Sequence, residues 1–240
     1  MAILTFDIEI SNVFDLRPGE DLERYAPFDI SVAATKVVGG EERLWLTNGA
    51  DGKPALNLAR SQAGELLGYL DAMQKQGHSL LAWNGLSFDL RWIGHAADDM
   101  ATARRVARKL YDPMFQFFKL KGFPVGLAKV GEGMGLRTTK LMDGADAPKQ
   151  WRAGNHQAVC DYVMGDVRMT ADVVDAVVRA RRISWITMRG TPSAARSATT
   201  PNSACSLITR RRPHESSDTL TRSSRAANLS RLMQMENEHE

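Results

Sequence analysis

The chain has 240 residues, of which 43% are apolar, and a formal net charge of +3. This length suffices for one domain of roughly 150–200 residues with a sizeable core, plus a short appendage. No run approaches the ~20 apolar residues of a membrane span, and the chain does not open with a basic segment followed by an apolar stretch. Cys160 and Cys205 fit neither a disulfide framework nor a paired metal knuckle. We therefore expect a soluble, cytoplasmic protein with no membrane partner; the oligomeric state stays open.

The positive charge is confined to the C-terminal quarter of the chain. Residues 1–185 carry 23 Lys and Arg against 23 Asp and Glu, whereas residues 186–240 carry eight arginines, no lysine and five acidic residues. Residues 186–240 also contain nine Ser and seven Thr but few large apolar groups. We expect a domain over residues 1–185 and a poorly ordered tail over 186–240. Any nucleic-acid site in the domain must come from local clustering of charge.

The first half of the chain predicts strands and one crossing helix. Strands are expected at 2–10, 28–38 and 42–46, with the last two joined as a hairpin through Gly39-Gly40. Apolar residues at helical spacing predict a helix over 61–76 that stops at Gly77. A short buried strand at 79–83 and an Asn84-Gly85 turn into a helix near Ser87 should follow.

The second half predicts mostly helices. A helical pattern runs from about 99 to 110 and breaks at Asp112-Pro113, and Gly122 interrupts the next segment. We expect a helix at about 125–133, a loop over Gly131–Gly135, a polar loop over 137–154 and a long helix over 156–183. This order describes an α/β protein with helices packed on a sheet.

Asp7 and Glu9 lie two residues apart in the first predicted strand, so both side chains leave the face opposite Phe6 and Ile8. Two adjacent carboxylates in an apolar strand repel one another and lose hydration, which is costly unless a cation or hydrogen-bond donors compensate. Mg²⁺ and Mn²⁺ prefer such oxygen ligands, and one aspartate can bridge two ions roughly 3.5–4 Å apart. The alternative is an edge strand whose polar face meets water.

Two further segments carry carboxylates beside groups suited to nucleic acid. Asp89 is expected in the first turn of the helix after the 79–83 strand, with Ser87 as its candidate cap. Asn84 could bond a substrate and Phe88 could stack on a base, although an Asn-Gly turn and a core phenylalanine are equally ordinary. Asp166 lies four residues after Tyr162 in the long helix, on the same face. The phenol could orient a water molecule at a metal, or the pair could be a simple surface contact.

Three segments together resemble, in order and spacing, the exonuclease motifs of the DEDD superfamily. They are Phe6-Asp7-Ile8-Glu9, Asn84-Gly85-Leu86-Ser87-Phe88-Asp89 and Tyr162-Val163-Met164-Gly165-Asp166. The tyrosine marks one subgroup, in which the chain resembles the proofreading exonuclease domains of B-family DNA polymerases and stand-alone proteins related to them. The resemblance covers about residues 1–185. It implies a ribonuclease H-like, three-layer α/β fold whose mixed five-stranded sheet is flanked by helices.

This resemblance also implies roles for the site residues. Asp7, Glu9 and Asp166 would hold the catalytic cation, Asp7 would also touch a second cation that Asp89 holds partly through water, and Tyr162 would position the attacking water. The implied cofactors are two divalent cations, Mg²⁺ or Mn²⁺. The implied activity is 3′-to-5′ exonuclease hydrolysis of single-stranded DNA or RNA ends, with DNA favoured. A catalytically silent nucleic-acid-binding module and a structure-specific endonuclease of the same fold are the alternatives.

Basic residues gather between the second and third motifs: Lys119, Lys121, Lys129, Arg137 and Lys140. We assign Lys119, Lys121 and Lys140 to substrate binding, because lysines in such a cluster can line the path of a nucleic-acid backbone. The alternative is that these basic residues lie in solvent-exposed loops and do not contact a substrate. Asp112, next to Pro113, is interpreted as a turn residue.

Overall fold

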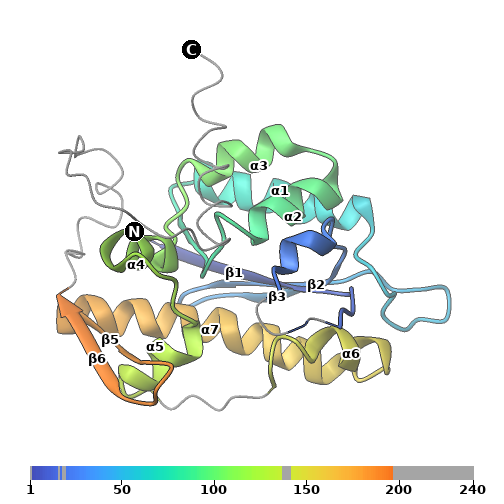
Figure 1. Cartoon of the computed structure of the whole chain (residues 1–240). Helices are drawn as coiled ribbons and strands as arrows, with labels where there is room; N and C mark the ends of the chain where they lie inside the picture. The colour runs from blue at the N-terminus through green and yellow to red at the C-terminus, as the bar shows by residue number, and fades with distance from the viewer. Residues whose placement is uncertain (1, 16, 18–19, 137–141, 197–240) are drawn as a thin grey trace.

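One mixed sheet forms the centre of the computed structural model, which describes residues 2–15, 17, 20–136 and 142–196 (Figure 1). Its four strands lie in the order β3-β2-β1-β4. They span Ile3–Ile10 (β1), Ile30–Val37 (β2), Glu42–Trp45 (β3) and Ser79–Leu81 (β4). β2 is antiparallel to both β1 and β3, whereas β4 is parallel to β1. The strand and hairpin predictions for residues 2–46 and 79–83 are confirmed.

The expected fifth strand is wrong for the part of the chain that the structure describes. Tyr111 forms only an isolated parallel bridge with Leu81. Its N–H donates to the Leu80 carbonyl at 3.0 Å, and its own carbonyl accepts from the Ala82 N–H at 3.3 Å. The pairing cannot continue because Pro113, which begins the next helix, has no N–H to donate.

Helices cover both faces of the sheet (Figure 1). One face carries α1 (Arg60–Lys75), α2 (Asp89–Ala97) and α3 (Met100–Ala107), which pack against Leu4, Phe6 and Ile8 of β1. The other face carries α6 (Ala147–Arg152) and α7 (His156–Ala180), which pack against Val32 and Ala34 of β2. Because Asp7 pairs with Ala34 and Glu9 with Val32 across the strands, both carboxylates leave the sheet on the α7 side.

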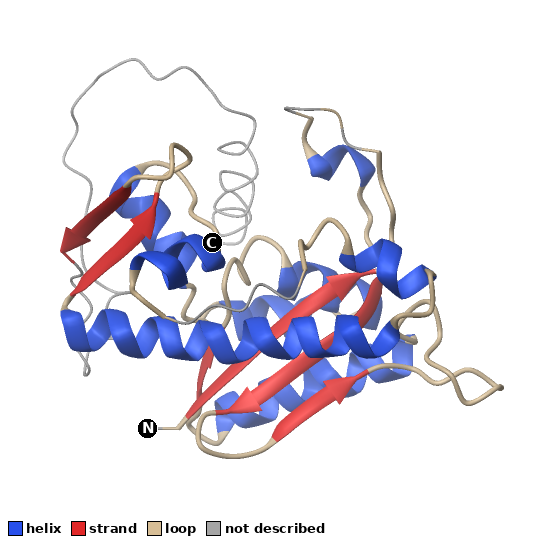
Figure 2. Cartoon of the chain, turned by 90° about the horizontal axis from the view of Figure 1, so that it is seen from below, coloured by secondary structure: helices blue, strands red, loops and turns tan. Residues whose placement is uncertain are grey.

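A separate apolar cluster lies at the C-terminal end of α7. It joins α7 to α4 (Pro113–Lys121), α5 (Leu127–Gly133) and the hairpin of β5 (Arg182–Ile186) and β6 (Pro192–Arg196), which Figure 2 shows beside one end of α7. An added Cβ at Gly133 would lie 2.3 Å from Cα of Trp185, so a glycine there permits this close packing. The segment Gly131–Gly135 was expected as a loop, but its first three residues form the end of α5.

Three other expectations differ from the structure. The expected loop over 137–154 contains α6, which Trp151 anchors by donating from Nε1 to the carbonyls of Ala55 and Leu56 at 3.1 Å each. α7 ends at Ala180 rather than 183, because Arg181 takes a left-handed conformation. The expected domain boundary after residue 185 falls inside β5.

The expectations for residues 197–240 lie outside the described residues. None of the described helices has the length and apolar character needed to cross a membrane.

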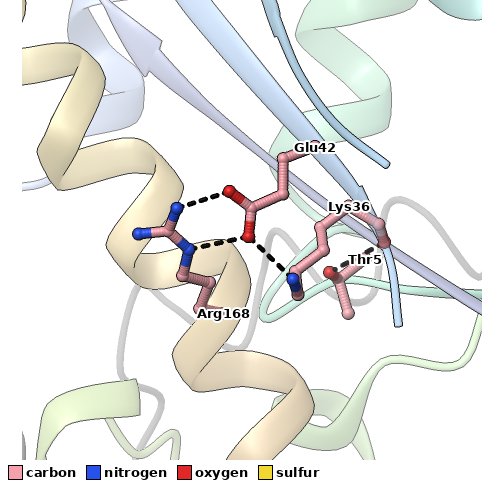
Figure 3. A network of polar contacts seen from close by, with 4 residues as sticks. All are labelled: Thr5, Lys36, Glu42 and Arg168. Atoms are coloured by element: carbon pink, nitrogen blue, oxygen red, sulfur yellow. Dashed lines mark hydrogen bonds and ion pairs between the residues drawn. The ribbon is translucent and has the colours of Figure 1, made fainter. Parts of the chain in front are cut away.

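A polar network fixes α7 to the strand hairpin β2–β3 (Figure 3). The Glu42 carboxylate on β3 accepts from Arg168 Nε on α7 at 2.8 Å and from Lys36 Nζ on β2 at 2.7 Å, and a second Arg168 nitrogen donates to its other oxygen. These donors lower the pKa of Glu42 to about 2, with Arg168 as the largest cause. Arg168 lies two residues after Asp166, so the network helps to set how α7 lies on the sheet beside Asp166.

Candidate metal centre

The sheet opens beside the two carboxylates of β1. β1 is an interior strand, which excludes the edge-strand alternative, but β4 accompanies it only along Ile3–Thr5. Beyond that point the Ile8 N–H donates to Oδ1 of Asp89 at 3.1 Å. Asp89 is the first residue of α2, as expected, and its side chain is buried. A carboxylate thus satisfies a backbone donor that β4 is too short to reach.

Three carboxylates converge at this opening. Asp7 and Glu9 from β1 and Asp166 from α7 each offer an oxygen within 4.8 Å of the others. Asp89 stands outside this group of three but forms a side-chain hydrogen bond with Asp7. The structure therefore brings together all four carboxylates that the sequence predicted, with Asp7 as the one that contacts both sides of the site.

Burial raises the pKa of all four carboxyl groups, and repulsion from neighbouring carboxylates adds to this effect at Asp7 and Glu9. Burial, reinforced by Asp89 and Asp166, raises the pKa of Asp7 well above its ordinary value, and burial with Asp166 does the same for Glu9. Burial raises the pKa of Asp89 to about 7 and that of Asp166 to about 6. No Lys or Arg among the described residues forms an ion pair with any of the four. Such a cluster is electrostatically incomplete without a cation.

Tyr162 lies over this cluster from α7. Its phenol lies one helical turn from the Asp166 carboxylate, close enough for each group to shift the pKa of the other. Burial, then the charges of Asp166 and Glu9, raise the pKa of Tyr162 above its ordinary value. The phenol is therefore protonated at neutral pH and acts as a hydrogen-bond donor rather than as a base. The simple surface contact considered for Tyr162 and Asp166 does not describe this partly buried pair.

Asp112 holds the loop that precedes Asp89, a role that the sequence did not indicate. Its buried carboxylate accepts from the backbone N–H groups of Asn84 at 3.1 Å and Leu86 at 3.0 Å. It also caps α4 by accepting from the Phe115 N–H at 3.0 Å. The Asp-Pro pair signals a helix start, but nothing in the sequence places this carboxylate beside residues 26 and 28 positions earlier.

A cavity of about 400 Å³ opens next to the second motif. Its lining includes Asn84, Ser87 and Phe88, the segment Pro124–Gly126, and the acidic residues Asp21 and Glu23. Asn84 has a positive φ of 70°, and its side-chain oxygen accepts from the Ser87 hydroxyl. Ser87 therefore does not cap α2 as expected: the capping position is Phe88, which makes no side-chain cap.

The remaining substrate-binding assignments have different outcomes. Phe88 lines the cavity and also packs on Phe28 and Trp92, with ring centroids 5.8 and 6.4 Å apart. Lys119 and Lys121 lie exposed near the end of α4 and do not line the cavity. Lys140 and Arg137 lie outside the described residues.

Comparison with known proteins shows similarity at the level of the fold. No family model and no curated protein matches the chain. Among solved structures, the chain is similar to the family B DNA polymerase from the hyperthermophilic archaeon Pyrobaculum calidifontis, with a TM-score of 0.50 and 18% identity. The match covers 73% of this chain and 24% of the polymerase chain. The chain thus spans about a quarter of the length of the polymerase it matches.

Proposed function

We propose that this protein is a metal-dependent 3′-to-5′ exonuclease of the ribonuclease H-like fold, which hydrolyses single-stranded nucleic-acid ends and favours DNA over RNA. The observation that carries the proposal is the convergence of Asp7, Glu9, Asp89 and Asp166 on one opening of the sheet, where no Lys or Arg of the described residues forms an ion pair with them. The order of the three motifs supports it, as does the fold-level similarity to a chain that is a DNA polymerase.

The donor set fits hard divalent cations such as Mg²⁺ or Mn²⁺, because it consists of buried carboxylates whose charges are otherwise uncompensated. Asp7, Glu9 and Asp166 would hold one cation, and Asp7 with Asp89 would hold a second. When bound, two such ions would activate a water molecule at neutral pH and would stabilise the charge that develops on the phosphoryl and leaving oxygens.

The other side chains position the reactants. Tyr162, kept protonated by its surroundings, donates its single O–H to the attacking water and so orients that water beside Asp166. The cavity beside Asn84 and Phe88 accepts the terminal nucleotide, with the Phe88 ring as a stacking platform for its base. A narrow cavity favours a frayed single strand over an intact duplex.

The proposal is tested with a 5′-labelled single-stranded oligonucleotide in Mg²⁺ or Mn²⁺, with DNA and RNA run side by side. We expect stepwise shortening by the wild type, immediate release of a mononucleotide from a 3′-labelled strand, and no products from Asp7→Ala. Asp161→Ala is the matched control, because Asp161 is an exposed carboxylate on α7, one residue before Tyr162. Internal cuts in a strand with blocked ends would identify an endonuclease, and binding without products would identify a silent module.

A further inference from the structure

The end of α4 and the loop after it form a surface that combines aromatic rings with positive charge. Residues 113–131 contain four phenylalanines and three lysines but no Asp or Glu. Lys119 Nζ lies 4.7 Å from the ring centroid of Phe115, and Lys121 Nζ lies 5.5 Å from that of Trp185. Neither lysine forms an ion pair within the described part of the chain. Their charges are therefore available to an external anion.

Phe123 is the exposed aromatic residue of this surface. Its side chain packs edge-on against Phe117 and Trp185, with ring centroids 5.5 and 6.5 Å apart. Even so, Phe123 is 46% exposed, and the nearby Leu120 is 55% exposed. A phenylalanine that is held in place by two rings and still open to solvent is suited to stacking against a planar ligand.

This surface continues from the cavity beside the metal centre. Phe123 immediately precedes Pro124, which lines that cavity together with Val125 and Gly126. Val125 in turn accepts a hydrogen bond at 3.1 Å from Nε1 of Trp83, the residue before Asn84. The second motif and the end of α4 are thus linked by direct contacts.

We propose that Lys119, Leu120, Lys121 and Phe123 form an extended binding surface for the single-stranded part of the substrate that lies 5′ of the terminal nucleotide. A base stacks on Phe123, and Lys121, which lies over the same Trp185 ring as Phe123, contacts the adjacent phosphate. Lys119 lies on another face of α4 and contacts a phosphate further along the strand. Stacking on an aromatic ring tolerates any base, and lysines read only the backbone, so the surface adds affinity without sequence preference. This inference rests on the proposed function, because it assumes that the cavity receives the 3′ end.

The surface is tested by fluorescence anisotropy in EDTA, where no hydrolysis occurs. The probes are a labelled single strand of about 12 nucleotides, within the span of one single-strand-binding fold, and a dinucleotide, whose 3′ nucleotide enters the cavity and which ends before the proposed surface. Phe123→Ala should weaken binding of the long strand roughly tenfold or more. Lys119→Ala with Lys121→Ala should lower the salt-dependence slope by about 1.4, since each phosphate contact contributes about 0.7 on a single strand. Phe123→Trp should retain affinity, and Lys149→Ala, an exposed lysine on α6, is the neutral control.

In Mn²⁺ the Phe123 and lysine variants should lose more turnover with the long strand than with the dinucleotide. Wild-type affinity of these variants for the long strand would overturn the inference, and so would an equal loss of turnover with the two substrates. If the wild type binds the long strand through Phe123 but hydrolyses nothing, the surface stands and the proposed exonuclease activity fails. If hydrolysis occurs without dependence on Phe123, the proposed exonuclease activity stands and the proposed surface fails.

Discussion

Asp89 and Ile8 are joined by a hydrogen bond of 3.1 Å from the Ile8 amide to Oδ1 of Asp89, at the point where β4 no longer accompanies β1. The same carboxyl group hydrogen bonds with Asp7. Asp89 is therefore both a structural acceptor for the sheet and a member of the acidic cluster, and these two roles can be separated by substitution.

Asp89→Asn should keep the fold but remove the activity. Asparagine retains a carbonyl oxygen for the Ile8 amide, yet it lacks the charge needed at a second cation. We expect an unfolding free energy within about 1 kcal/mol of the wild type and hydrolysis slower by about two orders of magnitude or more. Asp89→Ala should in addition lose about 1–3 kcal/mol, because the Ile8 amide is left unpaired. Urea denaturation and oligonucleotide hydrolysis measure the two effects, and an active Asp89→Asn would remove Asp89 from the metal centre.

Stability of the metal-free protein should fall as pH rises. Burial raises the pKa of Asp89 to about 7 and that of Asp166 to about 6, from an ordinary value of 3.8. Between pH about 4 and about 7 the folded protein holds protons that the unfolded chain has already released. The stabilisation that these two groups contribute is therefore fully present below pH about 4 and is lost as pH rises to about 7. Cations should restore stability most where the carboxylates are ionised.

Melting curves in EDTA and in Mn²⁺ at about pH 5 and about pH 8 measure this dependence. The Mn²⁺-induced rise in Tm should be larger at the higher pH. An Asp89→Asn, Asp166→Asn double variant should lose part of the pH dependence, since Asp7 and Glu9 also have raised pKa values, and should show a smaller Mn²⁺ effect. An equal Mn²⁺ effect at the two pH values would show that these carboxyl groups do not carry the raised pKa values.

Asp112→Asn should impair both stability and catalysis, although Asp112 contacts no reacting group in the proposal. An amide offers one acceptor oxygen in place of two, so at least one of the N–H groups of Asn84, Leu86 and Phe115 loses its partner. We expect a loss of about 1–3 kcal/mol in unfolding free energy. The rate should fall about 10- to 100-fold, as for other residues that orient a metal ligand.

Asp99→Ala provides the matched control for this prediction. Asp99 also caps a helix, α3, by accepting from the Thr102 N–H at 2.9 Å, but it contacts no part of the loop before Asp89. Its loss should cost about 1 kcal/mol and leave the rate unchanged. A rate loss in Asp112→Asn no greater than in Asp99→Ala would mean that the loop does not depend on Asp112.

Glu42→Gln should loosen α7 from the sheet. The substitution removes the charge that Arg168 and Lys36 share, and since the pair is partly exposed we expect a loss of only about 0.5–1 kcal/mol. Donors lower the pKa of Glu42 to about 2, so its contribution is present above the ordinary value of 4.5 and disappears as pH falls towards 2. Glu41→Gln is the control, because Glu41 pairs with Arg43 and not with α7. Urea denaturation at neutral and acidic pH distinguishes them, and identical behaviour of the two variants would contradict the proposed role of Glu42.

The core strands and the acidic cluster could be predicted because their signals are local. Alternation of apolar and acidic residues along β1 places Asp7 and Glu9 on one face, and helical spacing places Tyr162 beside Asp166. The order of these motifs was enough to predict four carboxylates that the structure brings together.

What the sequence did not predict depends on contacts between distant segments. α6 contains one large apolar residue, Trp151, whose partners lie more than 90 positions earlier. The hairpin β5–β6 was missed because Ile183 and Trp185 are buried against α4 and α5, which lie far away in the sequence, as well as against α7. The sequence indicates only a turn residue at Asp112, because its backbone partners in the second motif lie far away in the sequence.

The two-cation site is tested most directly by the number of Mn²⁺ ions that each chain binds, measured by electron paramagnetic resonance in the presence of a non-hydrolysable oligonucleotide. We expect two ions in the wild type, one in Asp89→Asn, and none bound tightly in Asp7→Asn, because Asp7 is the proposed ligand that both ions share. Two tightly bound ions in Asp7→Asn, or none in the wild type, would contradict the two-cation site.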